Sequence, residues 1–307
     1  MTTSESQRSA PAVDAMSLAD VPIRPPRRTR TRASVIAILL VCAYALQSLV
    51  RNPAMHWHVV GHYLFSVDIL KGIEVTLLLT FATMLLSLLI GGVLARMRIS
   101  GSPVLRTIST AYVWTFRALP VLVVLVVFFN LALFYPHLTI GVPFGHAFIS
   151  IRSQTVVTPM IAAIAAFTLN ESAYASEILR ASILAIDKGQ WEAAAAIGMP
   201  RRRAFRRIIL PQAIRIATPP LANDTINVLK GTALVAFIGV SDLLYSAQQI
   251  YQINFEVVPL LIVVTIWYVI LVGILTGFQY MLERRMARKG IWAPRSRTVA
   301  RIVERAT

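Results

Sequence analysis

Charged residues and cysteines are scarce in this sequence. Only 14% of its 307 residues are charged, and Cys42 is the one cysteine. A lone cysteine excludes an intrachain disulfide, so no covalent link of that kind holds the fold. Hydrophobic residues make up 56% of the chain, which is more than one water-surrounded core readily accommodates. The composition therefore indicates that lipid is the solvent for much of the chain.

Motifs for catalysis and for nucleotide binding are also absent. The chain has no GxxxxGKS/T phosphate loop, no HExxH zinc signature and no GxSxG nucleophile elbow. His56, His58 and His62 follow one another at spacings of two and four, beside Trp57 and Tyr63. Such a loop is more typical of a wetted aromatic belt than of converging metal ligands. We therefore expect this chain to bind no metal and no cofactor.

Positive charge greatly exceeds negative charge, with 30 Lys and Arg residues against 14 Asp and Glu residues. In a soluble protein this excess would favour nucleic-acid binding. Here the basic residues gather in short connections between apolar runs, which is the pattern that orients membrane proteins. The spacing needed for base or phosphate readout is absent, so nucleic acid is not an expected partner.

Six apolar runs are long enough to cross about 30 Å of hydrocarbon. They cover residues 33–50, 69–95, 117–136, 156–180, 217–240 and 257–281. The leading tail, 1–32, is rich in Ser, Pro and Arg and is expected to be disordered, and the trailing tail, 282–307, is basic. Both tails and the connections 96–106 and 180–215 are rich in arginine, whereas the other three connections hold only two arginines. The distribution predicts a multi-pass membrane protein with both termini in the cytoplasm.

Small and hydroxyl residues recur along the second predicted span. They stand at spacings of four, four, three, four and four: Gly72, Thr76, Thr80, Thr83, Ser87 and Gly91. These spacings place them on one helix face, where small side chains let neighbouring helices approach closely in lipid. We interpret the face as a packing surface rather than a substrate contact. Gly273 and Gly277 in the last span form a weaker, isolated pair of the same kind.

Two of the connections suggest helices that lie outside the spans. Residues 103–116 are amphipathic and are expected to lie at the cytoplasmic interface, entering the bilayer near Arg117 and Pro120. The connection 187–211 contains WEAAAAIGMPRRRAFRRIILP, with five arginines in seven residues. Alanines favour a first helix, Gly198 ends it and Pro200 is suited to begin a second. We interpret this hairpin as a docking site for another protein, with arginines that hold it at the anionic inner leaflet.

The hairpin resembles the EAA loop of permease subunits of bacterial ATP-binding-cassette (ABC) importers. The match consists of Glu192-Ala193-Ala194, Gly198, Ile208 and Leu210-Pro211 at the spacings of that loop. The stretches FRALPVLVVLVVFFN and LPQAIRIATPPLANDTINVLKGTAL resemble the polar amino-acid (histidine/glutamine-type) branch of this family. The resemblance covers residues 69–281. It implies an all-α integral membrane fold, the type I importer core of five helices, preceded here by an extra N-terminal span.

The resemblance also implies partners and roles. Two permease subunits, identical or related, would form the pathway, with ABC ATPase subunits beneath and an extracytoplasmic substrate-binding protein outside. The contact with the ATPase would fall to Glu192, Ala193, Ala194, Gly198 and Arg201. The sequence departs from the family where Asp-Thr-Ser-Leu is usual, having Gly231-Thr232-Ala233-Leu234, and where Arg-Gly-Thr-Pro is usual, having Arg117-Ala118-Leu119-Pro120. Both departures remove polar groups near the pathway.

Polar side chains inside the spans are costly and usually face a cavity or a partner. The candidates are Asn170, Glu171, Tyr174 and Glu177 in the fourth span and Asn223, Asp224, Asn227 and Lys230 in the fifth. Three interpretations stay open: a pathway in which a carboxylate receives a substrate ammonium, a gate between subunits, and plain interhelical hydrogen bonding. Glu177 stands three residues before Arg180, which predicts a simple ion pair.

The leading hypothesis is therefore an amino-acid permease subunit of the bacterial cytoplasmic (inner) membrane, with ATP hydrolysis left to a partner. The alternative is an ATP-independent secondary carrier or channel. Such a protein would not need the docking hairpin, and the sequence shows no internal repeat of spans, which many secondary carriers have. A membrane enzyme would need a nucleophile with a base, or a metal cluster, at recognisable spacing.

Overall fold

A computed structural model describes residues 28–141 and 147–287, and these residues are mostly helical. The chain divides into two units, one ending at Met55 and one beginning at His56. The first unit contains helix α1 (Arg28–Arg51) and the short helix η2 (Pro53–Met55). The predicted first span is thus helical. Helix α1 also begins inside the tail predicted to be disordered, most of which lies outside the described residues.

The second unit holds the remaining elements. In chain order they are α2 (Trp57–Tyr63), α3 (Val67–Ile99), α4 (Pro103–Ala118), α5 (Val121–Phe129), α6 (Leu131–Phe134), β1 (His137–Gly141), β2 (Ala147–Arg152), α7 (Ser153–Val156), α8 (Pro159–Leu184), α9 (Lys188–Ala196), α10 (Arg201–Ala204), η3 (Phe205–Ile209), α11 (Leu210–Gly231), η4 (Thr232–Ile238), α12 (Leu243–Asn254) and α13 (Val257–Ala287). Strands β1 and β2 form an antiparallel hairpin in a connection predicted to be a loop. Helix α13 runs into the predicted trailing tail, the rest of which lies outside the described residues.

Helices α3 and α13 are the two described helices that are long and apolar enough to cross a membrane. The number rises to four if each of two bent pairs counts as one span: α4 with α5, bent by 98°, and the segment Arg201–Ile238 with α12, bent by 44°. Helix α8 has 26 residues, enough to cross about 30 Å at 1.5 Å per residue. The polar residues of α8 lower its hydropathy, so it is not among the helices that are apolar enough to cross a membrane. The six predicted spans are thus found only in part.

The predicted third span, residues 117–136, is not one straight helix. Helix α4 starts at Pro103 and ends at Ala118, and α5 has only nine residues, about 13 Å of helix. Pro120 lacks a backbone N–H and disfavours helical geometry at the preceding residue, and Leu119 is accordingly extended. The entry point predicted near Pro120 is thus a sharp break between an amphipathic helix and a short apolar one.

The small-residue face of α3 is buried, as predicted. Gly72, Gly91 and all four hydroxyl residues between them are buried, and the face packs on α8 and α12. A Cβ added at Gly91 would lie 2.9 Å from the Ala175 Cβ atom, so only glycine permits this approach. By contrast, a Cβ at Gly273 or Gly277 would meet no described atom within 4 Å.

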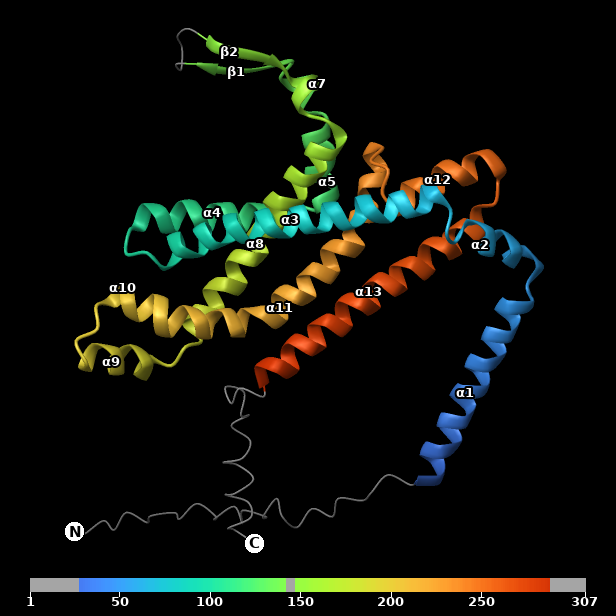
Figure 1. Ribbon diagram of the computed structural model, residues 1–307, viewed down its shortest axis with the longest axis horizontal. Helices are drawn as coiled ribbons and strands as arrows, with labels where there is room; N and C mark the ends of the chain where they lie inside the picture. The colour runs from blue at the N-terminus through green and yellow to red at the C-terminus, as the bar shows by residue number, and fades with distance from the viewer. Residues whose placement is uncertain (1–27, 142–146, 288–307) are drawn as a thin grey trace, which may run out of the picture. The chain divides into compact units, whose positions relative to one another are not determined.

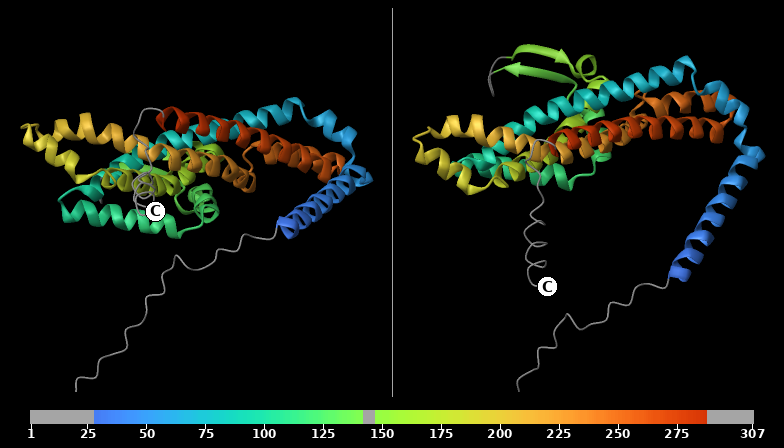
Figure 2. Two further views of the ribbon diagram at one scale, coloured as in Figure 1. Left: turned by 90° about the horizontal axis from the view of Figure 1, so that it is seen from below. Right: turned by 60° about the horizontal axis from the view of Figure 1, so that its bottom comes forward.

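The second unit has two distinct ends (Figures 1 and 2). Helices α9 and α10 lie at the end that also holds the turn between α3 and α4, whereas α2, α12 and the starts of α3 and α13 gather at the opposite end. At that opposite end, the His56 Nδ1 atom lies 2.7 Å from the Glu256 Oε2 atom, and Trp267 Nε1 donates to the Leu64 carbonyl. His56 and Glu256 thus form a side-chain contact between two loops.

Candidate functional site

The hairpin between α8 and α11 has well-defined helix ends. The Asp187 carboxylate accepts a hydrogen bond from the Gly189 N–H at 2.7 Å and begins α9. At its other end Gly198 has a φ of 71°, a left-handed conformation that favours glycine. The Met199 N–H donates to the Ala194 carbonyl and the Gly198 N–H to the Ala195 carbonyl, which is a Schellman motif. The predicted first short helix and its end at Gly198 are confirmed. The second helix, capped by Pro200, is not short, because α10 continues through η3 into α11 without a gap.

The base of the hairpin is fixed to both flanking helices. Ile186, Ile209 and Ala213 are buried together, and partly buried apolar residues surround them: Ile183, Trp191, Phe205, Ile208 and Ile216. The rings of Trp191 and Phe205 stack with their centroids 6.5 Å apart. This small core joins α9 and η3 to the last turn of α8 and the first turns of α11. The hairpin is therefore packed against both helices.

The predicted ATPase contacts do not all lie on the outer surface. Glu192, Ala193 and Gly198 are exposed, whereas Ala194 is only 2% exposed and faces inward. The Arg201 guanidinium lies 5.7 Å from the centroid of the Trp191 ring. The surface available to a partner therefore consists of Glu192, Ala193 and the residues up to Gly198 other than Ala194.

Glu171 of α8 and Asp224 of α11 are both partly exposed and lie close to each other. Their carboxyl groups are close enough to interact directly. The Glu171 Oε1 and Asp224 Oδ2 atoms are buried without a hydrogen-bond partner among the described residues. Two facing carboxyl groups with unsatisfied oxygens at membrane depth suit a proton or a cationic group between them.

The other predicted pathway residues divide into two sets. Asn170 donates from Nδ2 to the carbonyls of Phe116, at 2.7 Å, and Leu119, at 3.4 Å, so it stabilises the break after α4. The Arg117 guanidinium lies 5.3 Å from the centroid of the Tyr174 ring, so this pair also joins α8 to α4.

The second set lies on the open face of α11. Asn223, Asn227 and Lys230 are exposed, at the predicted spacings of four and three. The side chains of these three residues make no hydrogen bond or ion pair with another described residue. They therefore remain available to a substrate or a partner.

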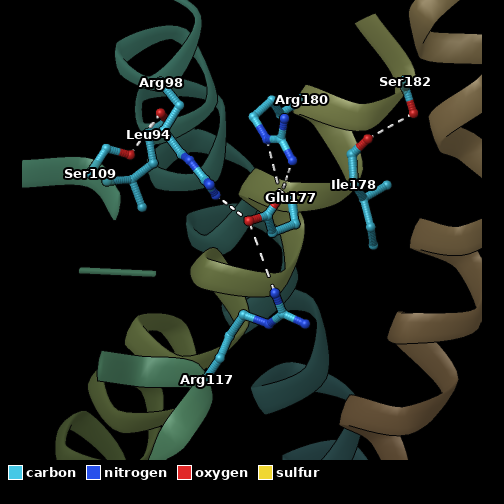
Figure 3. Close-up of polar contacts among 8 residues, drawn as sticks. All are labelled: Leu94, Arg98, Ser109, Arg117, Glu177, Ile178, Arg180 and Ser182. Carbon is cyan, nitrogen blue, oxygen red and sulfur yellow. Dashed lines mark hydrogen bonds and ion pairs between the residues drawn. The ribbon is translucent and has the colours of Figure 1, made fainter. Parts of the chain in front are cut away.

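Glu177 is the centre of a larger ionic cluster than the sequence predicted (Figure 3). Its carboxylate pairs with Arg180, as predicted, at 2.9 Å, and also with Arg98 at the end of α3. Arg117 lies 3.9 Å away on the other side. The cluster joins α3, α4 and α8, so Glu177 has a structural role. Sequence spacing could not reveal Arg98 or Arg117, because both belong to other helices.

A second polar cluster missed by the sequence lies at the opposite end. Asp242 is fully buried, and its Oδ1 atom accepts from the Tyr245 N–H at 2.9 Å to begin α12. The Thr76 Oγ1 atom accepts from the Leu243 N–H at 3.1 Å. A residue such as Asp before an apolar run is a helix-start signal, and this signal could have located the capping residue.

Apolar helices, a helical hairpin outside them and an acidic pair between them are features of an integral-membrane transport subunit. Residues 87–288 match the model of a family described as "Binding-protein-dependent transport system inner membrane component". The chain belongs to this family, whose members leave ATP hydrolysis to a partner subunit.

Individual relatives agree with this assignment. The chain is 37% identical over 269 residues to the arginine transport system permease protein ArgU of Corynebacterium glutamicum, covering 87% of this chain and 82% of the relative. It is 34% identical over 244 residues to the L-cystine transport system permease protein TcyB of Bacillus subtilis, covering 79% and 96%. A crystal structure of an amino acid ABC transporter with histidines matches with a TM-score of 0.61 and 30% identity, covering 71% of this chain and 94% of that chain.

Proposed function

We infer that this chain is the pathway-forming subunit of an importer for amino acids with a cationic side chain. The observation that carries the proposal is that α8 and α11 have two features in common. Each contributes one carboxyl group to the Glu171–Asp224 pair, and each is fixed to the base of the docking hairpin. Movement of the hairpin therefore acts on the two helices that hold the acidic pair.

The distances suit mechanical coupling. Glu171 stands twelve residues before Ile183, and Asp224 eleven residues after Ala213, so about 17 Å of helix separates the pair from the hairpin base on each side. A small rotation of either helix separates or joins the carboxyl groups. The exposed face of α9 and Gly198 would receive an ABC ATPase subunit, and closure of that partner would supply the rotation.

A cationic substrate suits the charge of this site. A guanidinium or ammonium group donates hydrogen bonds to both carboxylates and satisfies the buried oxygens. Asn223 and Asn227, on the neighbouring exposed face of α11, could hydrogen-bond the α-carboxylate, with Lys230 as its counter-charge. The relatives that transport arginine and cystine, by their names, support an amino-acid substrate.

The assembled importer would contain a second permease subunit, two ATPase subunits and an extracytoplasmic binding protein. The arginine-rich hairpin and the turn between α3 and α4 would lie in the cytoplasm with both termini. The chain would cross the membrane six times, with α1 as the additional span, α4 and α5 as one broken span, and α8 as a polar one.

Uptake of radiolabelled L-arginine and L-glutamine into vesicles holding the assembled complex tests the proposal. Glu171→Gln and Asp224→Asn should each lower L-arginine uptake about tenfold, the loss expected when one hydrogen bond to a charged group disappears. Glu283→Gln, which removes a carboxylate at the far end of α13, should change nothing. Undiminished L-arginine uptake in both site variants would refute the substrate site. Uptake without the ATPase would contradict the coupled mechanism.

A further inference from the structure

The residues after Gly198 form a second feature of the hairpin, separate from the α9 surface. An open surface hollow of about 630 Å³ lies beside α10 and η3. We call it the arginine pocket. Its lining residues are Pro200, Arg202, Arg203, Arg206 and Arg207.

Among the described residues, no ion pair compensates the charge of the arginine pocket. All four arginines are exposed, and the described ion pairs use other residues, centred on Glu177 and Glu256. Arg202 and Arg206 stand four residues apart, as do Arg203 and Arg207, and like charges at this spacing destabilise a helix. An arrangement that is unfavourable within the chain becomes favourable when an anion binds.

The backbone holds the four arginines in place. Residues Phe205–Ile209 form a π-helical turn, a rare geometry that is often found at functional sites. On the inner side, Ala204 and Ile209 are buried and Phe205 stacks on Trp191. Because the inner side of the segment is packed, the four arginines project from its outer side.

The residues that follow indicate which anion is bound. After Arg207, the next exposed residues on α11 are Pro211 and Ile214, at spacings of four and three, and Ile214 is 52% exposed. A cationic cluster directly above an exposed apolar strip is the pattern of a segment lying at the headgroup level of a membrane. Arginine binds phosphate oxygens through two parallel hydrogen bonds. A soluble phosphate would use the arginines but not the apolar strip.

We propose that the arginine pocket binds the phosphate headgroup of an anionic phospholipid of the cytoplasmic leaflet, with its acyl chains along Pro211 and Ile214. The bound lipid neutralises the like charges and fixes the hairpin at a constant depth. The lipid site does not depend on the identity of the transported substrate. Its test is therefore independent of the test of the Glu171–Asp224 site.

The test measures lipid binding to the purified full-length chain in neutral detergent. Native mass spectrometry follows the titration of palmitoyl-oleoyl phosphatidylglycerol, with phosphatidylcholine of the same acyl chains as the neutral comparison. The double variant Arg206→Gln/Arg207→Gln should weaken phosphatidylglycerol binding about 25-fold, since each basic residue near an anionic surface contributes about fivefold. Gln preserves helix propensity, and size-exclusion chromatography checks folding.

Controls separate this site from general charge attraction. Arg284→Gln/Arg285→Gln removes the same charge at the end of α13 and should leave phosphatidylglycerol binding unchanged. Replacing all four arginines of the pocket by Lys should retain only part of the binding, because the charge remains but the paired hydrogen bonds of arginine are lost. Inorganic phosphate at millimolar concentration should displace little lipid.

Three outcomes would overturn the proposal. Equal phosphatidylglycerol binding by the wild type and the Arg206→Gln/Arg207→Gln variant would show that the lipid binds elsewhere. Complete displacement by inorganic phosphate would show a site for a small soluble anion. Unchanged lipid binding with loss of the co-purifying ATPase would assign the arginines to the protein contact.

Discussion

Helices α3 and α13 are both long apolar helices that contain paired small residues, yet their glycines have different surroundings. A Cβ on Gly72 or Gly91 of α3 would lie at 3.0 Å or less from atoms of α8 or of the α12 region. A Cβ on Gly273 or Gly277 of α13 would meet no described atom within 4 Å. The same spacing thus marks a crossing point in one helix and an open surface in the other, and the partner helix makes the difference.

The largest expected effect comes from Gly91→Val. The new side chain would overlap the Ala175 side chain and the backbone of Ser172 and Ser176, which lie 2.9–3.0 Å from the Cβ position. Overpacking of this kind should lower the free energy of unfolding by about 3 kcal/mol, measured by thermal unfolding of the chain in detergent. Gly92→Val, one residue further along and facing open space, is the matched control. Equal destabilisation by the two substitutions would contradict the packing of α3 on α8.

Gly72→Ala should have the next largest effect. Its Cβ would lie 2.9 Å from both the Asp242 carbonyl oxygen and the Leu243 Cα atom, backbone atoms that cannot rotate away. We expect a loss of about 2 kcal/mol in the free energy of unfolding. Gly277→Ala places the same methyl group on α13 and should show no such loss. If both variants unfold at the wild-type temperature, α12 does not approach α3 as closely as described.

A smaller loss is expected from Thr76→Val, which keeps the volume and removes one hydrogen-bond acceptor. The Leu243 N–H would be left buried and unpaired, because it donates to the Thr76 Oγ1 atom at 3.1 Å. The cost should be about 1 kcal/mol. Thr265→Val on α13 is the control, since that hydroxyl is exposed and donates only to the Leu261 carbonyl of its own helix. Destabilisation by Thr265→Val that equals the effect of Thr76→Val would remove the distinction between the helices.

Sequence reasoning was most successful where one helix determines the outcome. The buried face of α3 and the Gly198 break follow from residue spacing and from the backbone preference of Gly. These features depend on neighbours along the chain, so the sequence displays them directly.

Sequence reasoning failed where the outcome depends on a second helix. Asn170 and Glu171 are adjacent in sequence, but successive helical residues point about 100° apart. Asn170 therefore contacts the end of α4, whereas Glu171 contacts Asp224 on α11. Ala194 likewise points inward because of how α9 packs on its neighbours, which the local sequence does not indicate. The arginines around Glu177 come from α3 and α4, and no local spacing indicates that they converge.

The smallest expected effect is that of Gly273→Ala. With no described atom within 4 Å of the new Cβ, the unfolding temperature of the isolated chain should stay the same or rise slightly, because alanine favours a helix more than glycine does. The informative measurement is the same substitution in the assembled importer. If Gly273→Ala weakens subunit association there while leaving the isolated chain unaffected, the open glycine surface of α13 is a crossing point whose partner is another chain. A clear loss of stability in the isolated chain would show instead that α13 already packs closely on a helix of its own subunit, and the contrast with α3 would disappear.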